Sequence, residues 1–456
     1  MDGHSTAAPD SSADGTRRIA YVMLAVVAVT VVGAGIRNAP PAFSVNDLSR
    51  WATVRALVDN GTYAIGQRDE HADTPSHDSG LMTEPAWFTV DVVMDPESRR
   101  FYSSKPLLLP TVIAGEYWLL RNLMGWNMER HRYAISRAIL LITNWLPFVL
   151  SLILFVRLAD RLGGTDWGRL LVFATACFGT FVSGYLTSLN NHTVAAAGAL
   201  FALYHTLRLH LDEDRRPWRF LAAGFFAGWA ACNELPAVSL AAGLFLWLTH
   251  LSWRQALRYA LPAMLIPVAA YFYVQYEALG SVLPTYALAD WYEFEGSYWL
   301  TPTGMDLADD PKPVYAFHLL AGHTGILSLT PVLLLGWIGM IRGASLRPWR
   351  WGTLPPQQIM ATLALGVTAV VFAFYVLRTS NYGGLTAGPR WFFWLTPLWL
   401  LTMLPEADRW ASSRWLRWLG YGLLAISVGS ALFALESPWR HNWLFTTLRA
   451  WGWIAY

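Results

Sequence analysis

The segment RRIAYVMLAVVAVTVVGAGIRNAPPAFSVNDLSRWATVRALVDNG, residues 17–61, decides the fold. Its first half contains an apolar run, 19–36, of about the length that a membrane-spanning helix needs. The pair Arg17 and Arg18 before this run predicts a cytoplasmic N-terminus. No small-residue cleavage motif follows the run, so it is predicted to be retained as a signal anchor. Its second half is amphipathic, which predicts a helix in the interface where the chain first leaves the bilayer.

The composition places the whole chain in the membrane class. Of 456 residues, 54% are hydrophobic and only 14% are charged, against about 25% charged in an average soluble domain. Tryptophan occurs 25 times, and this residue favours the headgroup level of a bilayer. The net charge of +2, without a basic run, gives no indication of a nucleic-acid partner. The two cysteines have neither disulfide nor metal-site spacing.

The alternation of arginine-rich and arginine-poor loops predicts the topology. Ten further apolar runs are predicted to span the membrane: 135–156, 169–186, 191–208, 218–233, 235–251, 257–277, 322–341, 357–377, 389–405 and 416–434. Arginine-rich loops alternate with arginine-poor ones only if the run 105–120 does not cross. We therefore predict an all-α polytopic membrane protein with about eleven spans, its N-terminus inside and its C-terminus outside.

This topology also predicts the domain organisation. Residues 1–16 are small and polar and are expected to form a disordered cytoplasmic tail. Residues 17–456 are expected to form a single transmembrane domain with two long outer loops, at about 37–134 and 278–321. Loops of this length in a compact protein are usually functional.

The first candidate site residue lies on the amphipathic helix. Ser44 is a plausible N-cap, and Asn60-Gly61 is a stop signal. An apolar stripe would anchor the helix and leave Asp47 and Arg50 towards water or protein. Asp47 is either an exposed first-turn acid that complements the helix dipole or part of a reactive centre.

Three more candidates follow at the predicted outer surface. Ser104 and Lys105 precede a proline, and the lysine could anchor in the interface or bind a lipid phosphate. His192 follows Asn191 at the start of a helix, as an interface residue or as a ligand for phosphate or acceptor. Arg390 stands at the outer mouth of a late span, where a charge is costly and often functional.

A last segment, 290–331, is rich in aromatic and acidic residues and includes His323. Aromatic rings beside carboxylates are common in sugar sites and equally common at membrane interfaces. The acids in this segment lack the spacing of a calcium loop. We predict no metal ligands and no required cofactor.

The whole arrangement resembles the GT-C membrane glycosyltransferases, in particular the branch of protein O-mannosyltransferases and lipid A aminoarabinose transferases. The acid that this branch carries early in its first outer loop matches Asp47 within NDLSRW. Its Lys-Pro-Pro-Leu element matches Lys105-Pro106-Leu107-Leu108, with leucine in place of the second proline. Where many relatives carry an acid in the second outer loop, this chain has Asn190, Asn191 and His192.

The resemblance implies an inverting sugar transfer from a polyprenyl-phosphate donor to an acceptor hydroxyl or other nucleophile. Asp47 would take the acceptor proton as general base, and Arg50 would orient its carboxylate. Lys105 and Arg390, with His192, would stabilise the leaving phosphate. Ser104, Asn191 and His323 would support the site.

The expected partners are membrane lipid, the polyprenyl-phosphate sugar, and a glycan, lipid or protein acceptor. The expected location is a bacterial inner membrane, with the active site on the outer face. One alternative is a transporter or lipid-linked-glycan flippase, although transporters usually concentrate charges and broken helices near the midplane. A non-catalytic assembly partner is another alternative, and it would tolerate the loss of Asp47.

Overall fold

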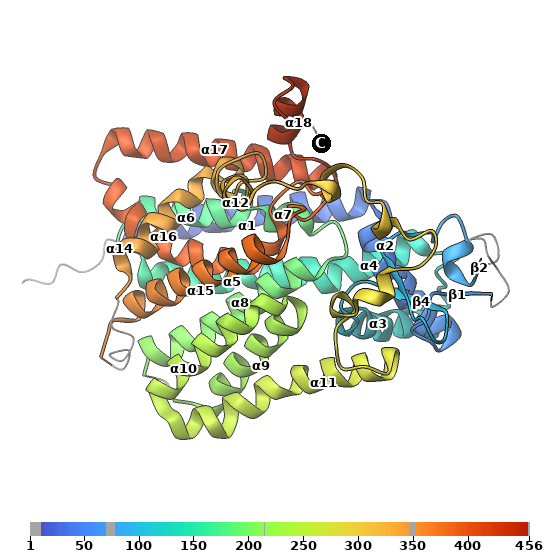
Figure 1. Ribbon diagram of the computed structural model, residues 1–456. Helices are drawn as coiled ribbons and strands as arrows, with labels where there is room; N and C mark the ends of the chain where they lie inside the picture. Colours follow the sequence, from blue (N-terminus) through green and yellow to red (C-terminus); the bar gives the residue numbers. More distant parts are fainter. Residues whose placement is uncertain (1–10, 70–77, 214, 346–352, 455–456) are drawn as a thin grey trace, which may run out of the picture.

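The computed structural model describes residues 11–69, 78–213, 215–345 and 353–454. Its helices run mostly along one common direction, with the first outer loop gathered at one end of the bundle (Figure 1). The helices of the N-terminal half are α1 (Ser11–Asn38), α2 (Val45–Arg55), α3 (Leu108–Met124), α4 (Arg132–Leu140), α5 (Leu146–Leu162), α6 (Asp166–Phe178), α7 (Phe181–Tyr185), α8 (Asn191–Leu211) and α9 (Pro217–Asn233). The remaining helices are α10 (Val238–Gln255), α11 (Leu261–Leu279), α12 (Lys312–Leu320), α13 (Ile326–Leu329), α14 (Leu334–Gly343), α15 (Pro356–Arg378), α16 (Thr396–Trp410), α17 (Arg414–Glu436) and α18 (Trp443–Ala450).

Seven helical stretches among the described residues are long and apolar enough to cross a membrane: 14–38, 132–162, 166–185, 191–211, 235–279, 356–378 and 414–436. The stretch 235–279 has 45 residues, about twice what one crossing requires. Ser252, with φ −166° and ψ 96°, breaks its helical geometry near the predicted loop between two spans. The other predicted spans fall on shorter helices, so the total of eleven and the orientation stay predictions.

The N-terminal boundary differs from the predicted one. Helix α1 begins at Ser11, so the last part of the segment expected to be a disordered tail is helical. Residues 1–10 of that segment lie outside the described residues. The polar residues 11–16 extend the first helix beyond its apolar run, because a helix already formed is lengthened at little cost.

The first outer loop contains a small sheet that the helical periodicity did not reveal. Strands β1 (Gly66–Arg68), β2 (Asp78–Ser79), β3 (Val92–Met94) and β4 (Arg100–Ser103) form an antiparallel sheet in the order β2-β1-β4-β3. Strands of two to four residues are too short to show a clear alternation of polar and apolar positions. The sheet lies beyond α2 and α4 at the end of the bundle (Figure 1).

Arg68 joins the two long outer loops. Its guanidinium donates to the Asp78 carboxylate at 3.0 Å and to the backbone carbonyl of Glu295 at 2.9 Å. The same group lies over the rings of Phe101 and Phe294, at 5.3 and 5.6 Å from their centroids. Loops predicted to share one face of the membrane therefore pack against each other.

Helix α3 occupies the ambiguous run 105–120 and is not among the seven long apolar stretches of the described residues. The Tyr117 hydroxyl donates to the Asp59 carboxylate at 3.0 Å, and Arg121 donates to the same carboxylate at 2.7 Å. These bonds tie α3 to the end of the α2 segment. That the run 105–120 does not cross the membrane stays a prediction.

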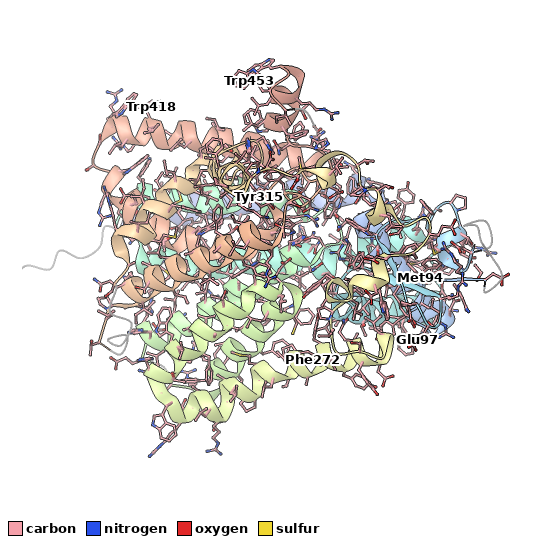
Figure 2. All side chains as sticks on the ribbon, viewed as in Figure 1. Met94, Glu97, Phe272, Tyr315, Trp418 and Trp453 are labelled. Atoms are coloured by element: carbon pink, nitrogen blue, oxygen red, sulfur yellow. The ribbon has the colours of Figure 1, made fainter. Side chains whose placement is uncertain are left out.

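The hydrophobic core is formed by the inner faces of the long helices. Tyr315 of α12 is fully buried near the middle of the molecule, whereas Trp418 of α17 and Phe272 of α11 lie at its surface (Figure 2). Trp418 is 62% exposed and Phe272 is 46% exposed. Apolar side chains on the outward faces of long helices are what a lipid-embedded bundle requires.

Candidate active site

The candidate site is a network of buried and half-buried titratable side chains drawn from four regions of the chain. Helix α2 supplies Asp47 and Arg50, the segment after β4 supplies Lys105, the start of α8 supplies His192, and the 3-10 helix Arg390–Leu395 supplies Arg390. Of the eight residues predicted to form or support the site, only His323 lies outside this network.

Asp47 is buried, with 1% of its surface exposed, rather than an exposed first-turn acid. It occupies the third position of α2 and closes a capping box with Ser44, which confirms the predicted N-cap. One carboxylate oxygen accepts from the Ser44 backbone N–H at 2.8 Å, and the other accepts from the Phe43 N–H at 2.9 Å. The Ser188 hydroxyl approaches the second oxygen at 3.4 Å. Burial raises the pKa of Asp47 to about 6, although these N–H groups and the nearby Arg50 charge oppose the shift.

Arg50 does not pair with Asp47 directly, contrary to the prediction that it orients that carboxylate. Its guanidinium donates to the Asn191 side-chain carbonyl through Nε at 3.0 Å and also through a terminal nitrogen. The other terminal nitrogen donates to the backbone and side-chain carbonyls of Asn46, at 2.8 and 2.7 Å. Residues 46 and 50 are neighbours on one face of α2, one helical turn apart. The carbonyls of Asn46 and Asn191 accept the hydrogen bonds of the guanidinium, so Arg50 makes no direct bond to the Asp47 carboxylate.

Asn191 forms hydrogen bonds with two other segments of the chain. It accepts from Arg50, and its side-chain amide donates to the Asn233 backbone carbonyl at 2.8 Å. It thereby connects α2, α8 and the end of α9.

Burial, reinforced by the Arg390 charge, lowers the pKa of Arg50 to about 10, so this guanidinium stays charged at neutral pH.

Lys105 forms an ion pair with Asp91 at 2.8 Å between Nζ and the carboxylate. Both groups are largely buried, with side-chain exposures of 16% and 7%. The backbone carbonyl of Asp91 accepts from the Ser49 hydroxyl at 2.6 Å, which fastens this pair to α2. Burial lowers the pKa of Lys105 to about 8; Asp91 opposes the shift, and Arg50 and Arg390 add to it.

Ser104 precedes this lysine and is buried beside it. Its hydroxyl has no hydrogen-bond partner among the described residues, and its backbone carbonyl accepts from the Thr285 hydroxyl at 2.9 Å. Helix α3 begins at Leu108, so Pro106 precedes the helix and does not lie in its first turn. The serine-lysine segment therefore belongs to the bent connection between β4 and α3.

His192 lies between a carboxylate and a guanidinium. Its Nδ1 contacts the Glu234 carboxylate, and Arg390 approaches its Nε2 at 3.1 Å. Because a guanidinium can only donate, Nε2 accepts, so the ring proton of the neutral imidazole is on Nδ1. Glu234 is 6% exposed, and burial raises its pKa to about 8, against the opposing charges of Arg390 and Arg50.

Arg390 is oriented by the glycine-rich segment before it. The backbone carbonyl of Gly383 accepts from its guanidinium at 2.8 Å. Gly383 and Gly384 have φ values of 89° and 68°, which favour glycine and let the chain turn back on itself. The Trp439 ring lies 4.8 Å from the guanidinium carbon, and the Trp439 N–H donates to the Ser188 hydroxyl at 2.7 Å. Ser188 and Trp439 thus link Asp47 to Arg390.

His323 lies elsewhere, contrary to its predicted supporting role. Its ring contacts His318, Tyr382 and Phe445, with centroids 4.1, 4.9 and 5.5 Å away. The histidine is fully buried in this aromatic cluster between α12 and α18. It therefore holds the second long outer loop against the C-terminal segment.

Two carboxylates of the site, Asp91 and Glu234, were not predicted from the sequence. Glu234 lies in the arginine-poor loop CNEL, and an acid between two predicted spans could have indicated a functional residue. Asp91 stands in an apolar context, TVDVV, without a helical pattern. Only the sheet brings it beside Lys105.

The site holds three cations, Arg50, Lys105 and Arg390, against three carboxylates. With the pKa of Glu234 near 8, that carboxyl is mostly neutral at pH 7, which leaves an excess of positive charge. Such a site favours an anionic group such as a phosphate. No cluster of three or more histidine, cysteine or acidic residues among the described residues could hold a metal ion.

No protein-family model and no curated protein sequence matches this chain. Its structure is similar to the crystal structure of ArnT from Cupriavidus metallidurans in the apo state, a lipid A aminoarabinose transferase. The TM-score is 0.54 at 12% sequence identity, over 93% of this chain and 76% of that one. At this identity the similarity shows the fold alone, and the predicted GT-C-like fold of an integral, multi-pass membrane protein is confirmed.

The Archaeoglobus fulgidus oligosaccharyltransferase in its apo form is also similar, with a TM-score of 0.45 and 12% identity over 94% of this chain and 57% of that one. A complex of the same archaeal enzyme, AglB, with an inhibitory peptide and a dolichol-phosphate has a TM-score of 0.41 and 12% identity. It covers 91% of this chain and 55% of that one.

Proposed function

We propose that the protein is an inverting membrane glycosyltransferase that moves a sugar from a polyprenyl phosphate to an acceptor nucleophile on the outer face. The observation that carries the proposal is the convergence of Arg50, Lys105 and Arg390 with buried carboxylates in one network. A phosphate leaving group needs cations, and a hydroxyl acceptor needs a base. The GT-C-like fold supports the same reaction class.

In the proposed reaction, Asp47 is the general base. Its oxygens accept two short backbone bonds, whereas the Ser188 hydroxyl at 3.4 Å is a weak partner. An acceptor hydroxyl that replaces Ser188 would keep both backbone bonds and give its proton to the carboxylate. The acceptor oxygen then bonds to C1 of the sugar while the bond from C1 to the phosphate oxygen breaks, which inverts the configuration.

The phosphate leaves as an anion, and Lys105 and Arg390 stabilise its growing charge. His192 positions Arg390 through the contact between its Nε2 and the guanidinium, and Glu234 contacts the other nitrogen of the His192 ring. Charge stabilisation by one such preorganised group is worth about 3 kcal/mol in other enzymes. The polyprenyl chain lies among the helices, and the acceptor is a glycan, a lipid or a protein.

The experiment is a transfer assay with full-length protein in proteoliposomes that contain polyprenyl-phosphate hexoses and pentoses. Wild-type protein should release polyprenyl phosphate in the presence of an acceptor extract, and Asp47→Asn should not. The control Glu97→Gln changes an exposed acid of the same loop and should leave transfer intact (Figure 2). Full turnover by Asp47→Asn would refute the base assignment. Movement of the donor between leaflets without sugar release would instead support a flippase, which the rim position of the charges disfavours.

A further inference from the structure

A cavity of about 310 Å³ lies beside the charged network, in a part of the molecule to which no role has been assigned. Its walls come from the linker between α1 and α2, from α2 itself, from Trp87 and from the start of α4. Small-molecule sites typically have volumes of about 300–1,000 Å³. The cavity is therefore large enough for a sugar ring with one substituent.

This cavity shares a wall with the proposed base. Phe43 and Ser44 line it, and the backbone N–H groups of the same two residues hold the Asp47 carboxylate at 2.9 and 2.8 Å. One stretch of backbone thus separates the cavity from the reactive group. Asp47 itself does not line the cavity, so a molecule bound there would have to extend past Ser44 to reach its carboxylate.

The cavity walls are aromatic. Phe43, Trp51, Trp87 and Tyr133 all line it. The Trp51 indole N–H has no hydrogen-bond partner among the described residues. Aromatic faces with nearby hydroxyl groups, here those of Ser44 and Tyr133, are suited to a sugar ring.

Two arginines lie beside the Trp87 ring, and they differ in whether nearby carboxylates neutralise their charge. Arg55 lies 5.0 Å from the ring centroid and is neutralised by Glu84 at 2.8 Å and Glu129 at 2.9 Å. Arg132 lies 5.6 Å from the same ring, and one of its nitrogens donates to the Ala86 carbonyl at 3.0 Å. Arg132 lines the cavity. Among the described residues, no carboxylate lies within ion-pairing distance of it, so its charge is available to an anionic ligand.

We propose that this cavity binds the non-reacting part of the acceptor, and that the acceptor is an acidic saccharide. Its sugar ring packs against the aromatic walls, its phosphate or carboxylate binds Arg132, and its attacking hydroxyl reaches Asp47. This inference rests on the proposed glycosyltransferase function. The same chemistry is found in a lipid-carried headgroup and in a soluble glycan, and the test separates these two sources.

The test measures ligand binding to full-length protein in phosphatidylcholine nanodiscs by saturation-transfer NMR. The probes are dodecyl glucuronide, neutral dodecyl glucoside and free glucuronic acid. The glucuronide should bind about tenfold or more tightly than the glucoside, as a charge-assisted hydrogen bond predicts. Arg132→Gln should abolish this preference, whereas Arg130→Gln, which changes an exposed arginine outside the cavity lining, should preserve it.

Tyr133→Ala is a second probe that should fold, because Tyr133 is 53% exposed. It should weaken the binding of both dodecyl probes. Equal binding of the two probes, or an unchanged preference in Arg132→Gln, would overturn the proposal. Free glucuronic acid that shows the same Arg132 dependence would identify a soluble acceptor, and binding of the dodecyl probe alone would identify a lipid-carried one.

The test also separates failure of this inference from failure of the proposed function. Asp47→Asn should bind the glucuronide normally while it loses sugar transfer. Loss of the Arg132 dependence with Asp47-dependent transfer intact would refute the acceptor cavity alone. Binding with no transfer by wild-type protein from any donor would leave a saccharide-binding cavity and remove the enzymatic function.

Discussion

The ion pair between Lys105 and Asp91 allows a structural role to be separated from a catalytic one. At 2.8 Å the pair has a Coulomb attraction of about 6 kcal/mol at an effective dielectric constant of 20. The desolvation of two buried ions offsets much of this attraction, so the net value of the intact pair is small. Breaking it from one side is different, because the remaining charge is then buried without a partner.

We therefore predict that Lys105→Met lowers the free energy of unfolding by about 3–5 kcal/mol, since it leaves Asp91 uncompensated. The double variant Asp91→Asn/Lys105→Met should return to within about 1–2 kcal/mol of wild type, because neither ion then remains. Sugar transfer should stay reduced by about 100-fold or more in both variants, since neither has the cation that stabilises the leaving phosphate.

The measurements are SDS-induced unfolding in detergent micelles and the transfer assay in proteoliposomes. The control is Lys312→Met, because Lys312 is exposed and has no carboxylate partner among the described residues; it donates to the Thr379 carbonyl at 2.9 Å and lies 5.6 Å from the Tyr315 ring centroid. It should change stability by less than about 1 kcal/mol and leave transfer unchanged. Recovery of transfer in the double variant would refute the reasoning, because Lys105 would then act only by neutralising Asp91.

Three further outcomes are expected. Since burial raises the pKa of Asp47 to about 6, the base is ionised only above that pH, and kcat/KM should fall as pH is lowered through about 6; a pH-independent rate between 5 and 7 would contradict this. Arg390→Lys cannot donate to both His192 and Gly383 in the same fixed geometry and should lower kcat about 10-fold or more, whereas Arg378→Lys, at the exposed end of α15, should not. Leu123→Cys, at a position that is 80% exposed on α3, should react with an impermeant maleimide from outside in intact cells; labelling only after permeabilisation would place α3 on the cytoplasmic side.

The sequence predicted the fold class well because membrane insertion depends on local quantities. The hydrophobicity of each run and the charge of each loop are properties of short stretches, and neither needs tertiary contacts to be read. The N-cap at Ser44 and the helix end at Gly61, where φ is 68°, also depend only on residues close by in the sequence. The sheet in the first outer loop escaped detection because its strands are held by pairing with one another rather than by a pattern in any one of them.

The candidate site was predicted in part. Arg390 could be identified because a charge at the mouth of a span is unusual in itself, and Asp47, Lys105 and His192 because the loop charges predict that they lie on the same face of the membrane. Their partners could not be identified, because hydrogen bonding depends on geometry across the fold. Arg50 lies one helical turn from Asp47, yet its guanidinium contacts Asn191, which is 141 positions away.

The sequence by itself thus determined that the chain is a polytopic membrane protein and which polar residues stand at the ends of its helices. Only the tertiary structure decided which of those residues share a site. It brought Asp91 and Glu234 into the network and placed His323 outside it. The physical reason is that the cost of burying a charge is visible in the sequence, whereas the partner that offsets this cost comes from another part of the chain.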